Sequence, residues 1–443
     1  MREMKDSRVE WIGQIPAHWN LVRLKSLIVT RDGGAWGEEA AGRDGDMICL
    51  RIADFDYQRY CFKSHGELTV RHFKPDVIER LRLMPGDILV EKSGGGEKTP
   101  VGRAVLFDKD YSALYSNFMD RLRCKDGINP QWLLYNWATL YANNYTRPYI
   151  KQTTGIQNLD ISGLLSSQFI ALPSENEQEK VLSVVLNESK KVDALIANVQ
   201  AQIEKLKDYK QSVITEVVTK GLDPAVPMKD SGIEWIGKIA ETHTIFRLKY
   251  LLDSPMQYGA NESGDKFVED SVRYIRITDI TADGKLKNDE NNQYLPLDAA
   301  DGYILKDKDV LFARSGGTVG KSFLYQEDYG TSAFAGYLIK AECDKSALLP
   351  EYLIYYSQSS LYELWKNMIF IQATIQNIGA NKYSNMEIPV PSIDEQATIV
   401  EYLEGKCAQI DRLIAIKQAK IEKLEQYKRS LIYEYVTGKR EVS

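Results

Sequence analysis

Two short glycine-rich segments flanked by cations are the parts of this sequence best suited to bind an anionic partner. Glycine lets backbone N–H groups approach a phosphate closely, and a neighbouring lysine or arginine attracts it. Farther along the chain, each segment is followed by a glutamine and an asparagine that are neighbours in the sequence. Their side-chain amides can form paired hydrogen bonds with adenine. The candidate DNA-binding residues are Lys92, Ser93, Gly94, Gly95, Lys98, Arg103, Gln157 and Asn158 in the first set, and Arg314, Ser315, Gly316, Gly317, Lys321, Gln376 and Asn377 in the second.

Both sets also have a plainer explanation. A glycine segment that follows a strand can be a tight turn and nothing more. The glutamine–asparagine pair occurs in both sets, although two different DNA sequences should require different contacts. A structural hydrogen-bonding role is therefore favoured for the amides, and DNA contact and a plain turn both stay open for the glycine segments.

Motifs of covalent chemistry are absent from the sequence. The segment Gly94–Thr99 (GGGEKT) does not have the spacing of a phosphate-binding loop. The four histidines are dispersed without a metal-binding pattern, so no metal site is predicted. Asn129–Trp132 (NPQW) lacks the second proline of the adenine-methyltransferase motif, and no serine or cysteine triad can be assembled. The sequence predicts no catalytic residue and a chain that is not an enzyme.

Composition limits the possible environments and partners. The net charge of −6 argues mildly against a nucleic-acid partner, but local patches decide phosphate contact. The sequence has no run of eighteen apolar residues and no apolar signal at its N-terminus, so we expect neither a membrane span nor secretion. Five scattered cysteines fit a reduced cytoplasmic protein.

The elements that must position these residues occur twice. Lys5–Ile15 (KDSRVEWIGQI) returns 224 positions later as Lys229–Ile239 (KDSGIEWIGKI). Asp193–Thr219 returns as Asp411–Thr437, with 17 of 27 positions identical. The chain is therefore a tandem duplication whose ends match and whose middles have diverged. Two similar frames with different inserts predict simultaneous contact with two similar but unequal targets.

Each repeat has mixed short strands and helices without a regular βαβ alternation, which indicates an α+β fold. In both repeats the glycine segment follows a strand-like run, and a long helix ends the repeat. We expect two domains, two long helices and a proline-containing linker. Their predicted bounds are 1–174 and 229–392 for the domains, 175–221 and 393–439 for the helices, and 222–228 for the linker.

The two long helices carry apolar residues in alternating steps of three and four, which is the pattern of a coiled-coil seam. The seam residues are Val192, Ile196, Val199, Ile203, Leu206, Val213 and Val217 in the first helix, and Ile410, Ile414, Ile421, Leu424 and Leu431 in the second. We expect an antiparallel pair, a rod of about 60 Å, with one domain at each end and an approximate two-fold axis. Lys210 and Lys428 interrupt the seam, through snorkelling or, less favoured, to set its register. The alternative is that each helix packs on its own domain.

Several short motifs in a fixed order suggest a family. They are Glu-Trp-Ile-Gly near each start, Gly86–Val90 (GDILV) before a Ser-Gly-Gly segment, Ile156–Leu159 (IQNL), and Pro-Ser-x-x-Glu-Gln before each long helix, at Glu177-Gln178 and Glu395-Gln396. Together they resemble the specificity (S, HsdS) subunit of type I restriction–modification enzymes. The resemblance covers essentially the whole chain and occurs twice.

The resemblance implies a fold and a function. Two tandem target recognition domains, separated by two long helices that form an antiparallel coiled coil, would each recognise one half of an asymmetric, bipartite site in double-stranded DNA. The helices would set the spacing and dock two methyltransferase (M) subunits, which would use S-adenosylmethionine to methylate adenine. Restriction/translocase (R) subunits would use ATP and Mg²⁺, and this chain would bind no cofactor. The alternatives are a two-headed protein-interaction scaffold, or the specificity subunit of a related type II-like system.

Overall fold

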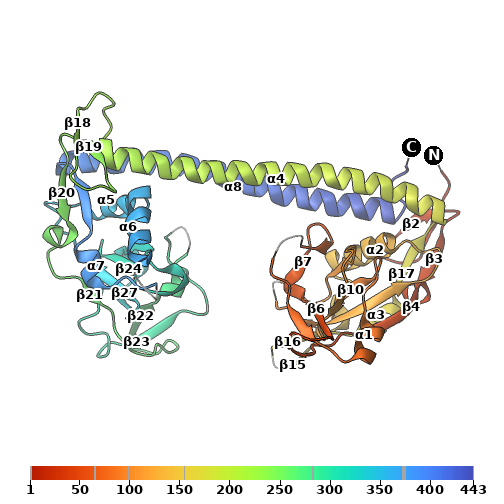
Figure 1. Cartoon of the computed structure of the whole chain (residues 1–443). Coiled ribbons are helices and arrows are strands. Elements are labelled where there is room, and N and C mark those ends of the chain that lie inside the picture. Colours follow the sequence, from red (N-terminus) through yellow and green to blue (C-terminus); the bar gives the residue numbers. More distant parts are fainter. Residues whose placement is uncertain are drawn as a thin grey trace. The chain divides into compact units, whose positions relative to one another are not determined.

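The computed structural model describes residues 2–63, 66–97, 99–153, 155–281, 284–371 and 376–442 (Figure 1). The chain divides into two compact units, one of residues 1–199 with 419–443 and the other of residues 200–418. Each unit contains one α+β domain together with part of each long helix. The duplication seen in the sequence is therefore present as two structures of the same kind.

The repeated opening segment forms the same small hairpin in both units. Strand β1 (Met4–Asp6) pairs antiparallel with β2 (Gln14–Pro16), and β18 (Met228–Asp230) pairs with β19 (Lys238–Ala240) in the same register. The connection between the strands buries Trp11. The Glu-Trp-Ile-Gly motif is thus a turn that inserts an indole into the core.

The central sheet of the first domain has the strand order β12-β10-β14-β4. Its strands are β4 (Ile28–Gly33), β10 (Ile88–Glu91), β12 (Ala104–Leu106) and β14 (Met119–Cys124). Strand β10 is buried along its whole length: Ile88 and Val90 enter one hydrophobic core, and Leu89 enters another. A strand covered on both faces needs a continuous apolar run, which explains the sequence Ile-Leu-Val.

The other elements of the first domain surround this sheet. The remaining strands are β3 (Asn20–Arg23), β5 (Glu38–Glu39), β6 (Asp46–Leu50), β7 (Phe55–Asp56), β8 (Cys61–Phe62), β9 (Val70–His72), β11 (Ser93–Gly94), β13 (Ala113–Tyr115), β15 (Ile150–Thr153), β16 (Ile156–Leu159) and β17 (Phe169–Leu172). The helices are α1 (Pro75–Leu81), α2 (Pro130–Ala142) and α3 (Ile161–Ser167). Strand β6 runs parallel to β13, β17 pairs antiparallel with β3, and β11, β16 and β15 form a small sheet.

The second domain repeats this topology. Its central sheet has the order β25-β24-β27-β21, β22 runs parallel to β26, and β20 pairs with β28. The strands are β20 (Thr244–Arg247), β21 (Gln257–Tyr258), β22 (Ser271–Ile275), β23 (Gln293–Pro296), β24 (Val310–Ala313), β25 (Ser322–Leu324), β26 (Ser332–Phe334), β27 (Leu338–Ala341) and β28 (Glu387–Val390), and the helices are α5 (Pro350–Tyr356), α6 (Ser360–Ile371) and α7 (Ala380–Ser384). The pair α5 and α6 follows the sheet where the first domain has α2 alone.

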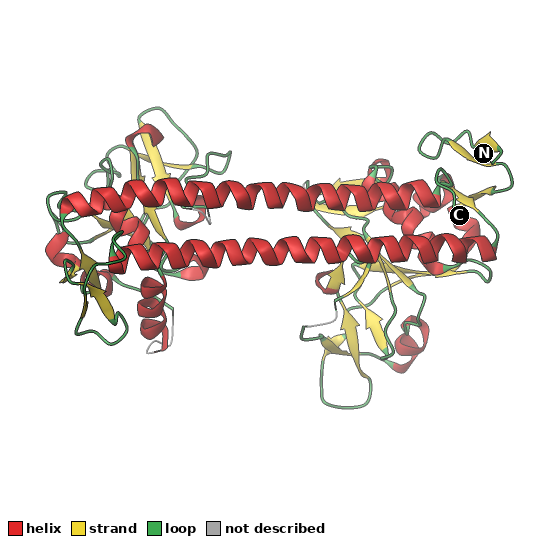
Figure 2. Ribbon diagram, turned by 90° about the horizontal axis from the view of Figure 1, so that it is seen from above, coloured by secondary structure: helices red, strands yellow, loops and turns green. Residues whose placement is uncertain are grey.

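Two long helices, α4 (Glu175–Lys220) and α8 (Ile393–Val436), run side by side in opposite directions within each unit (Figure 2). In the first unit Asp193 is paired with Lys428, and in the second Lys210 is paired with Asp411. From Asp193 to Lys210 the residue number rises along α4, while that of the partner falls from Lys428 to Asp411 along α8. The two helices are therefore antiparallel. The predicted antiparallel coiled coil is confirmed.

The seam residues differ in how far they are enclosed. Those that are buried are Val192, Ile196, Val199, Ile203, Val217, Ile410, Ile421 and Leu431, and those that are half-buried are Leu206, Val213, Ile414 and Leu424. Lys428 is also buried, and Lys417 occupies a further seam position and donates to Gln202 across the pair at 2.6 Å. The seam therefore mixes apolar contacts with polar ones.

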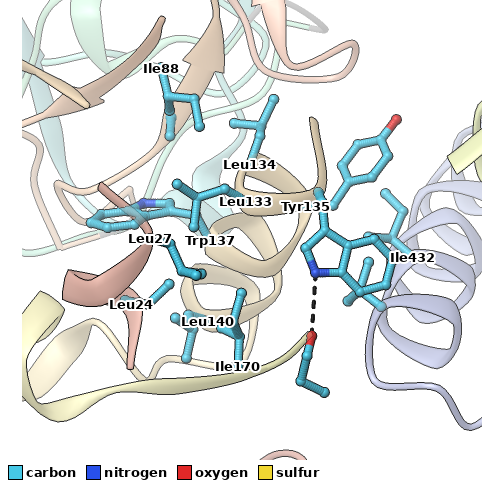
Figure 3. Close-up of a cluster of buried hydrophobic side chains, with 14 of the residues drawn as sticks. Leu24, Leu27, Ile88, Leu133, Leu134, Tyr135, Trp137, Leu140, Ile170 and Ile432 are labelled. Carbon is cyan, nitrogen blue, oxygen red and sulfur yellow. Dashed lines mark hydrogen bonds between the residues drawn. The ribbon is translucent and has the colours of Figure 1, made fainter. Parts of the chain in front are cut away.

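The end of each helix enters a domain core. Figure 3 shows Ile432 of α8 on one side of α2, opposite Leu24 and Leu27 of the first domain. In the second unit Ile214 and Val218, near the end of α4, belong to the core of the second domain. Each domain is thus completed by the end of the helix that began in the other repeat.

The Glu-Gln motif fixes the start of each long helix. The carboxylate of Glu177 accepts a hydrogen bond from Trp19 Nε1 at 2.8 Å, and the carboxylate of Glu395 lies 3.2 Å from His243 Nε2 at the equivalent place. The amides of the fully buried Gln178 and Gln396 bond the backbone of their own domains. These contacts set where each helix leaves its domain.

Candidate nucleic-acid interface

The first glycine segment lies beside the glutamine–asparagine pair. Strand β11 pairs with β16, so that Ser93 is opposite Asn158 and Gly94 is opposite Gln157. Ser93 Oγ donates to Asn158 Oδ1 at 2.6 Å. Gly95 has φ +71, and a Cβ there would lie 2.6 Å from the backbone nitrogen of Val101. This close approach is the physical reason for glycine at that position.

The two amides have different surroundings. Gln157 is buried, and its Oε1 accepts a hydrogen bond from the backbone N–H of Val101 at 3.1 Å. The side chain of Asn158 is exposed. Gln157 therefore supports the loop from below, while Asn158 can be reached from outside.

Three cations lie near this loop, each held by a buried carboxylate. Lys92 Nζ is 3.0 Å and Arg31 Nε is 2.6 Å from the carboxylate of Asp120, whose side chain is 2% exposed. Two cations on one anion leave one positive charge in excess, on side chains that are still about one-third exposed. The guanidinium of Arg103 forms two hydrogen bonds with buried Glu91, so its charge is already balanced.

Arg103 is also fixed by an aromatic ring. Its guanidinium lies 3.6 Å from the ring centre of Tyr57, whose hydroxyl bonds Glu91. Burial and the neighbouring Glu91 raise the pKa of Tyr57 well above its usual value, so the phenol stays protonated and donates. Lys98 lies outside the described residues.

The second glycine segment has the same place in its domain but different support. The backbone of Ser315 forms an isolated antiparallel β-bridge with that of Asn377, and Arg314 Nε donates to Asn377 Oδ1 at 3.3 Å. Gly316 has φ +78, and the short helical turn Gly316–Thr318 includes Gly317.

Arg314, Gln376 and Lys321 complete the second set of candidate residues, and their surroundings differ. The guanidinium of Arg314 also lies 5.0 Å from the ring centre of Tyr258. Gln376 is exposed, and Lys321, just before β25, is half-buried. An aromatic ring and an amide thus position the cation here, where a carboxylate does so in the first domain.

The strand registers make this difference explicit. In the first domain β10 pairs Glu91 with Met119 and Val90 with Asp120. The matching pairs of the second domain are Ala313 with Leu338 and Phe312 with Ile339. Apolar side chains thus replace both buried carboxylates. The two domains present a glycine segment at the same place in the sheet with different charges around it, which suits binding to two similar but unequal targets.

Several of these partners could not be named from the sequence. Arg31 and Asp120 come from strands far apart in the chain, and the turns that carry the exposed Phe118 and Tyr337 follow no recognisable motif. These residues can be recognised by comparing the two repeats strand by strand, once the sheet registers are known.

Other kinds of site find little support among the described side chains. No cluster of three or more histidine, cysteine, aspartate or glutamate residues in the described ranges is arranged to hold a metal ion. Burial raises the pKa of Cys49 to about 11 and that of Cys343 to about 12, so both thiols stay protonated and unreactive at neutral pH. Within the part of the chain that the structure describes, no helix is long and apolar enough to span a membrane.

Comparisons with known proteins agree with this structure. Residues 257–426 match the family model of the type I restriction modification DNA specificity domain. The type I restriction enzyme MjaVIII specificity subunit of Methanocaldococcus jannaschii is 27% identical over 340 residues, which cover 74% of each chain. The putative MjaX specificity subunit of the same organism is 24% identical over 97% of this chain and 95% of that protein.

A solved structure shares the fold. It comes from work on complex assembly and conformational transition of a type I R-M system, and it superposes with a TM-score of 0.63 over 95% of this chain and 98% of that one, at 15% identity. At such an identity the likeness concerns the fold alone.

Proposed function

We propose that this protein, which belongs to the family of type I restriction–modification specificity subunits, directs a methyltransferase complex to an asymmetric, bipartite DNA site. The single observation that carries the proposal is the pair of domains with one topology, a glycine segment at the same place in each, and different side chains around that segment. Each domain would recognise one half-site. Phosphate contacts would position each domain, and base contacts would specify its half-site.

The long helices would set the distance between the half-sites. A helix of 46 residues is about 69 Å long. That length is enough for two domains to contact half-sites at least one turn of DNA apart, which is about 34–36 Å. The spacing of the DNA site would then be a consequence of helix length and of the register of the seam.

The helices would also dock the partner subunits, and two equivalent patches support this. Leu195 and Tyr427 lie beside the Asp193–Lys428 pair in the first unit, and Leu413 and Tyr209 lie at the equivalent place in the second. The side chains are 49% and 49% exposed in the first patch and 48% and 48% in the second. Equal apolar patches favour two copies of one partner.

Heptad positions place each patch on one side of the seam. Leu195 and Tyr209 are two heptads apart on α4, and in an antiparallel pair their position flanks the same side as that of Leu413 and Tyr427 on α8. In the first unit the domain contacts the opposite flank, where Gln58 Nε2 donates to Glu425 at 3.0 Å. The patch is therefore free for a methyltransferase subunit.

Catalysis would belong to the partners. Methyltransferase subunits would bind S-adenosylmethionine and methylate an adenine in each half-site, and restriction/translocase subunits would use ATP and Mg²⁺. This chain would supply recognition, spacing and docking without covalent chemistry. Because its net charge is −6, we expect weak binding to DNA by the isolated chain and tight binding only in the complex.

Mapping of methylated adenines in host DNA tests the function. Deletion of this chain should abolish one bipartite motif from the methylation map, and expression of the chain in the deletion strain should restore it. An unchanged map after deletion would contradict the proposal and would favour a protein-interaction scaffold.

A further inference from the structure

An exposed aromatic side chain occupies the same turn in both domains. Phe118 follows β13 and precedes β14, and Tyr337 follows β26 and precedes β27. Their exposed fractions are 45% and 60%. Isolated apolar residues on a surface are common, so exposure alone has no meaning. Here the exposed ring recurs at one place in two diverged domains, which chance exposure does not explain.

The two turns are built with the same hydrogen bonds. The N–H of Met119 donates to Ser116 O at 3.1 Å, and the N–H of Leu338 donates to Ala335 O at 2.8 Å. Each turn thus closes over four residues, with the aromatic residue third.

The carbonyl of each aromatic residue is also tied to the glycine segment. Phe118 O accepts a hydrogen bond from the N–H of Lys92 at 2.8 Å, and Tyr337 O accepts one from the N–H of Arg314 at 2.9 Å. The backbone of each aromatic residue is therefore joined directly to the backbone of a cationic residue, Lys92 or Arg314.

A glycine supports each turn from beneath. Gly34 N–H donates to Met119 O at 3.0 Å, and a Cβ on Gly34 would lie 2.2 Å from Ser116 O. Gly259 N–H donates to Leu338 O at 3.2 Å, and a Cβ on Gly259 would lie 2.3 Å from Phe334 O. Because any larger residue would displace the turn, both domains hold the ring on a closely packed backbone.

The chemistry of the surroundings identifies the ligand. The backbone of each aromatic residue is bonded to that of the cationic residue before the glycine segment, and in both domains the kind of side chain is retained while its identity changes, from phenylalanine to tyrosine and from lysine to arginine. A flat apolar face beside a positive charge fits a base beside its phosphate. A rigid backbone lowers the entropy cost of placing the ring there.

We propose that Phe118 and Tyr337 stack on bases of their own half-sites and act as wedges beside the adenine that is methylated. Lys92 and Arg314 contact the neighbouring phosphate. A methyltransferase must take its target base out of the duplex, and an inserted aromatic ring stabilises the opened base step. The inference rests on the proposed function, because it assumes that these faces meet DNA.

The test uses the complete complex with the variants Phe118→Ala and Tyr337→Ala. The readout is the rate of adenine methylation on a duplex that carries the motif mapped in host DNA. Loss of a stacking contact should lower the rate about 10-fold at limiting DNA. The conservative variants Phe118→Tyr and Tyr337→Phe should keep the rate within about two-fold, while Phe118→Leu, apolar but not flat, should behave like Phe118→Ala.

Matched controls come from exposed side chains outside the glycine segments and outside the two aromatic turns. Met84 is 53% exposed near the start of β10, at the other end from Lys92, and Tyr250 is 69% exposed in the second domain. Met84→Ala and Tyr250→Ala should leave methylation unchanged. Thermal unfolding of every variant should match the wild type, because the rings contribute little to the cores.

The outcomes separate this inference from the proposed function. Wild-type rates for both alanine variants would refute the wedge even if deletion of the chain abolishes methylation, and full activity of Phe118→Leu would refute stacking by a flat ring. A methylation map that does not change on deletion would refute the proposed function itself. A 10-fold loss that the aromatic variants restore would support both.

Discussion

Lys428 and Lys210 occupy equivalent positions in the coiled-coil seam, yet the structure predicts very different consequences for their removal. Lys428 Nζ bonds both carboxylate oxygens of Asp193, at 2.7 and 2.9 Å, and the carbonyl of Gln58 at 2.7 Å, and its side chain is 8% exposed. Lys210 bonds Asp411, but the two side chains are 25% and 54% exposed. We compare Lys428→Met with Lys210→Met, because methionine keeps the apolar stem of lysine.

The expected magnitudes follow from burial. Removal of one partner from a buried ion pair costs about 3–5 kcal/mol, and the partial exposure of Asp193 (23%) favours about 3 kcal/mol. An exposed pair such as Lys210–Asp411 contributes less than about 1 kcal/mol. For a unit of roughly 220 residues, about 3 kcal/mol corresponds to a fall in Tm of about 6–12 °C.

Calorimetry measures the difference between the Tm shifts of the two variants, and hydrogen exchange shows which unit is destabilised. In Lys428→Met the transition of the first unit should move, with faster exchange over residues 419–436, while Lys210→Met should shift by less than about 4 °C. The added replacement Asp193→Asn should recover part of the loss by removing the uncompensated charge. Equal shifts for the two lysine variants would refute the reasoning from burial.

Three further predictions follow from the same structure. Exchange of residues 24–169 for the matching segment of a relative should change one half of the methylated motif and leave the other unchanged, as a methylation map would show. Deletion of one heptad from facing positions of both α4 and α8 should shorten the permitted spacer by about three base pairs, since seven residues span about 10 Å. Burial lowers the pKa of His243 in spite of its contact with Glu395, so the unfolded state binds the proton more readily than the folded state. The contribution of His243 to the free energy of unfolding should therefore be complete above about pH 6.5 and fall as the pH drops below it. Urea unfolding measured at several pH values should show this dependence in the wild type and not in His243→Gln.

The sequence contained enough information for the fold class and for the order of domains and long helices, but not for the sheet pairings or the site. Repeated motifs predict two equivalent domains, and the seam spacing predicts α4 and α8, because both signals are local and periodic. The support of Lys92 by Asp120 depends on the pairing of β10 with β14, which joins residues far apart in the chain. Seam spacing also marks Lys210 and Lys428 as interruptions, but their aspartate partners appear only when the helices are paired.

The comparison of the two units separates what assembly needs from what recognition needs. The hairpins, the helix starts, the exposed leucine–tyrosine patches and the Asp–Lys pairs recur at equivalent positions in both units. The side chains that hold the cations of the glycine segments do not recur, since Glu91 and Asp120 are replaced by Ala313 and Ile339. Under the proposed function, selection for two identical partner contacts would preserve the first group, and selection for an asymmetric DNA site would allow the second to diverge. An exchanged domain should therefore change the DNA sequence that is methylated without weakening the binding of either methyltransferase subunit.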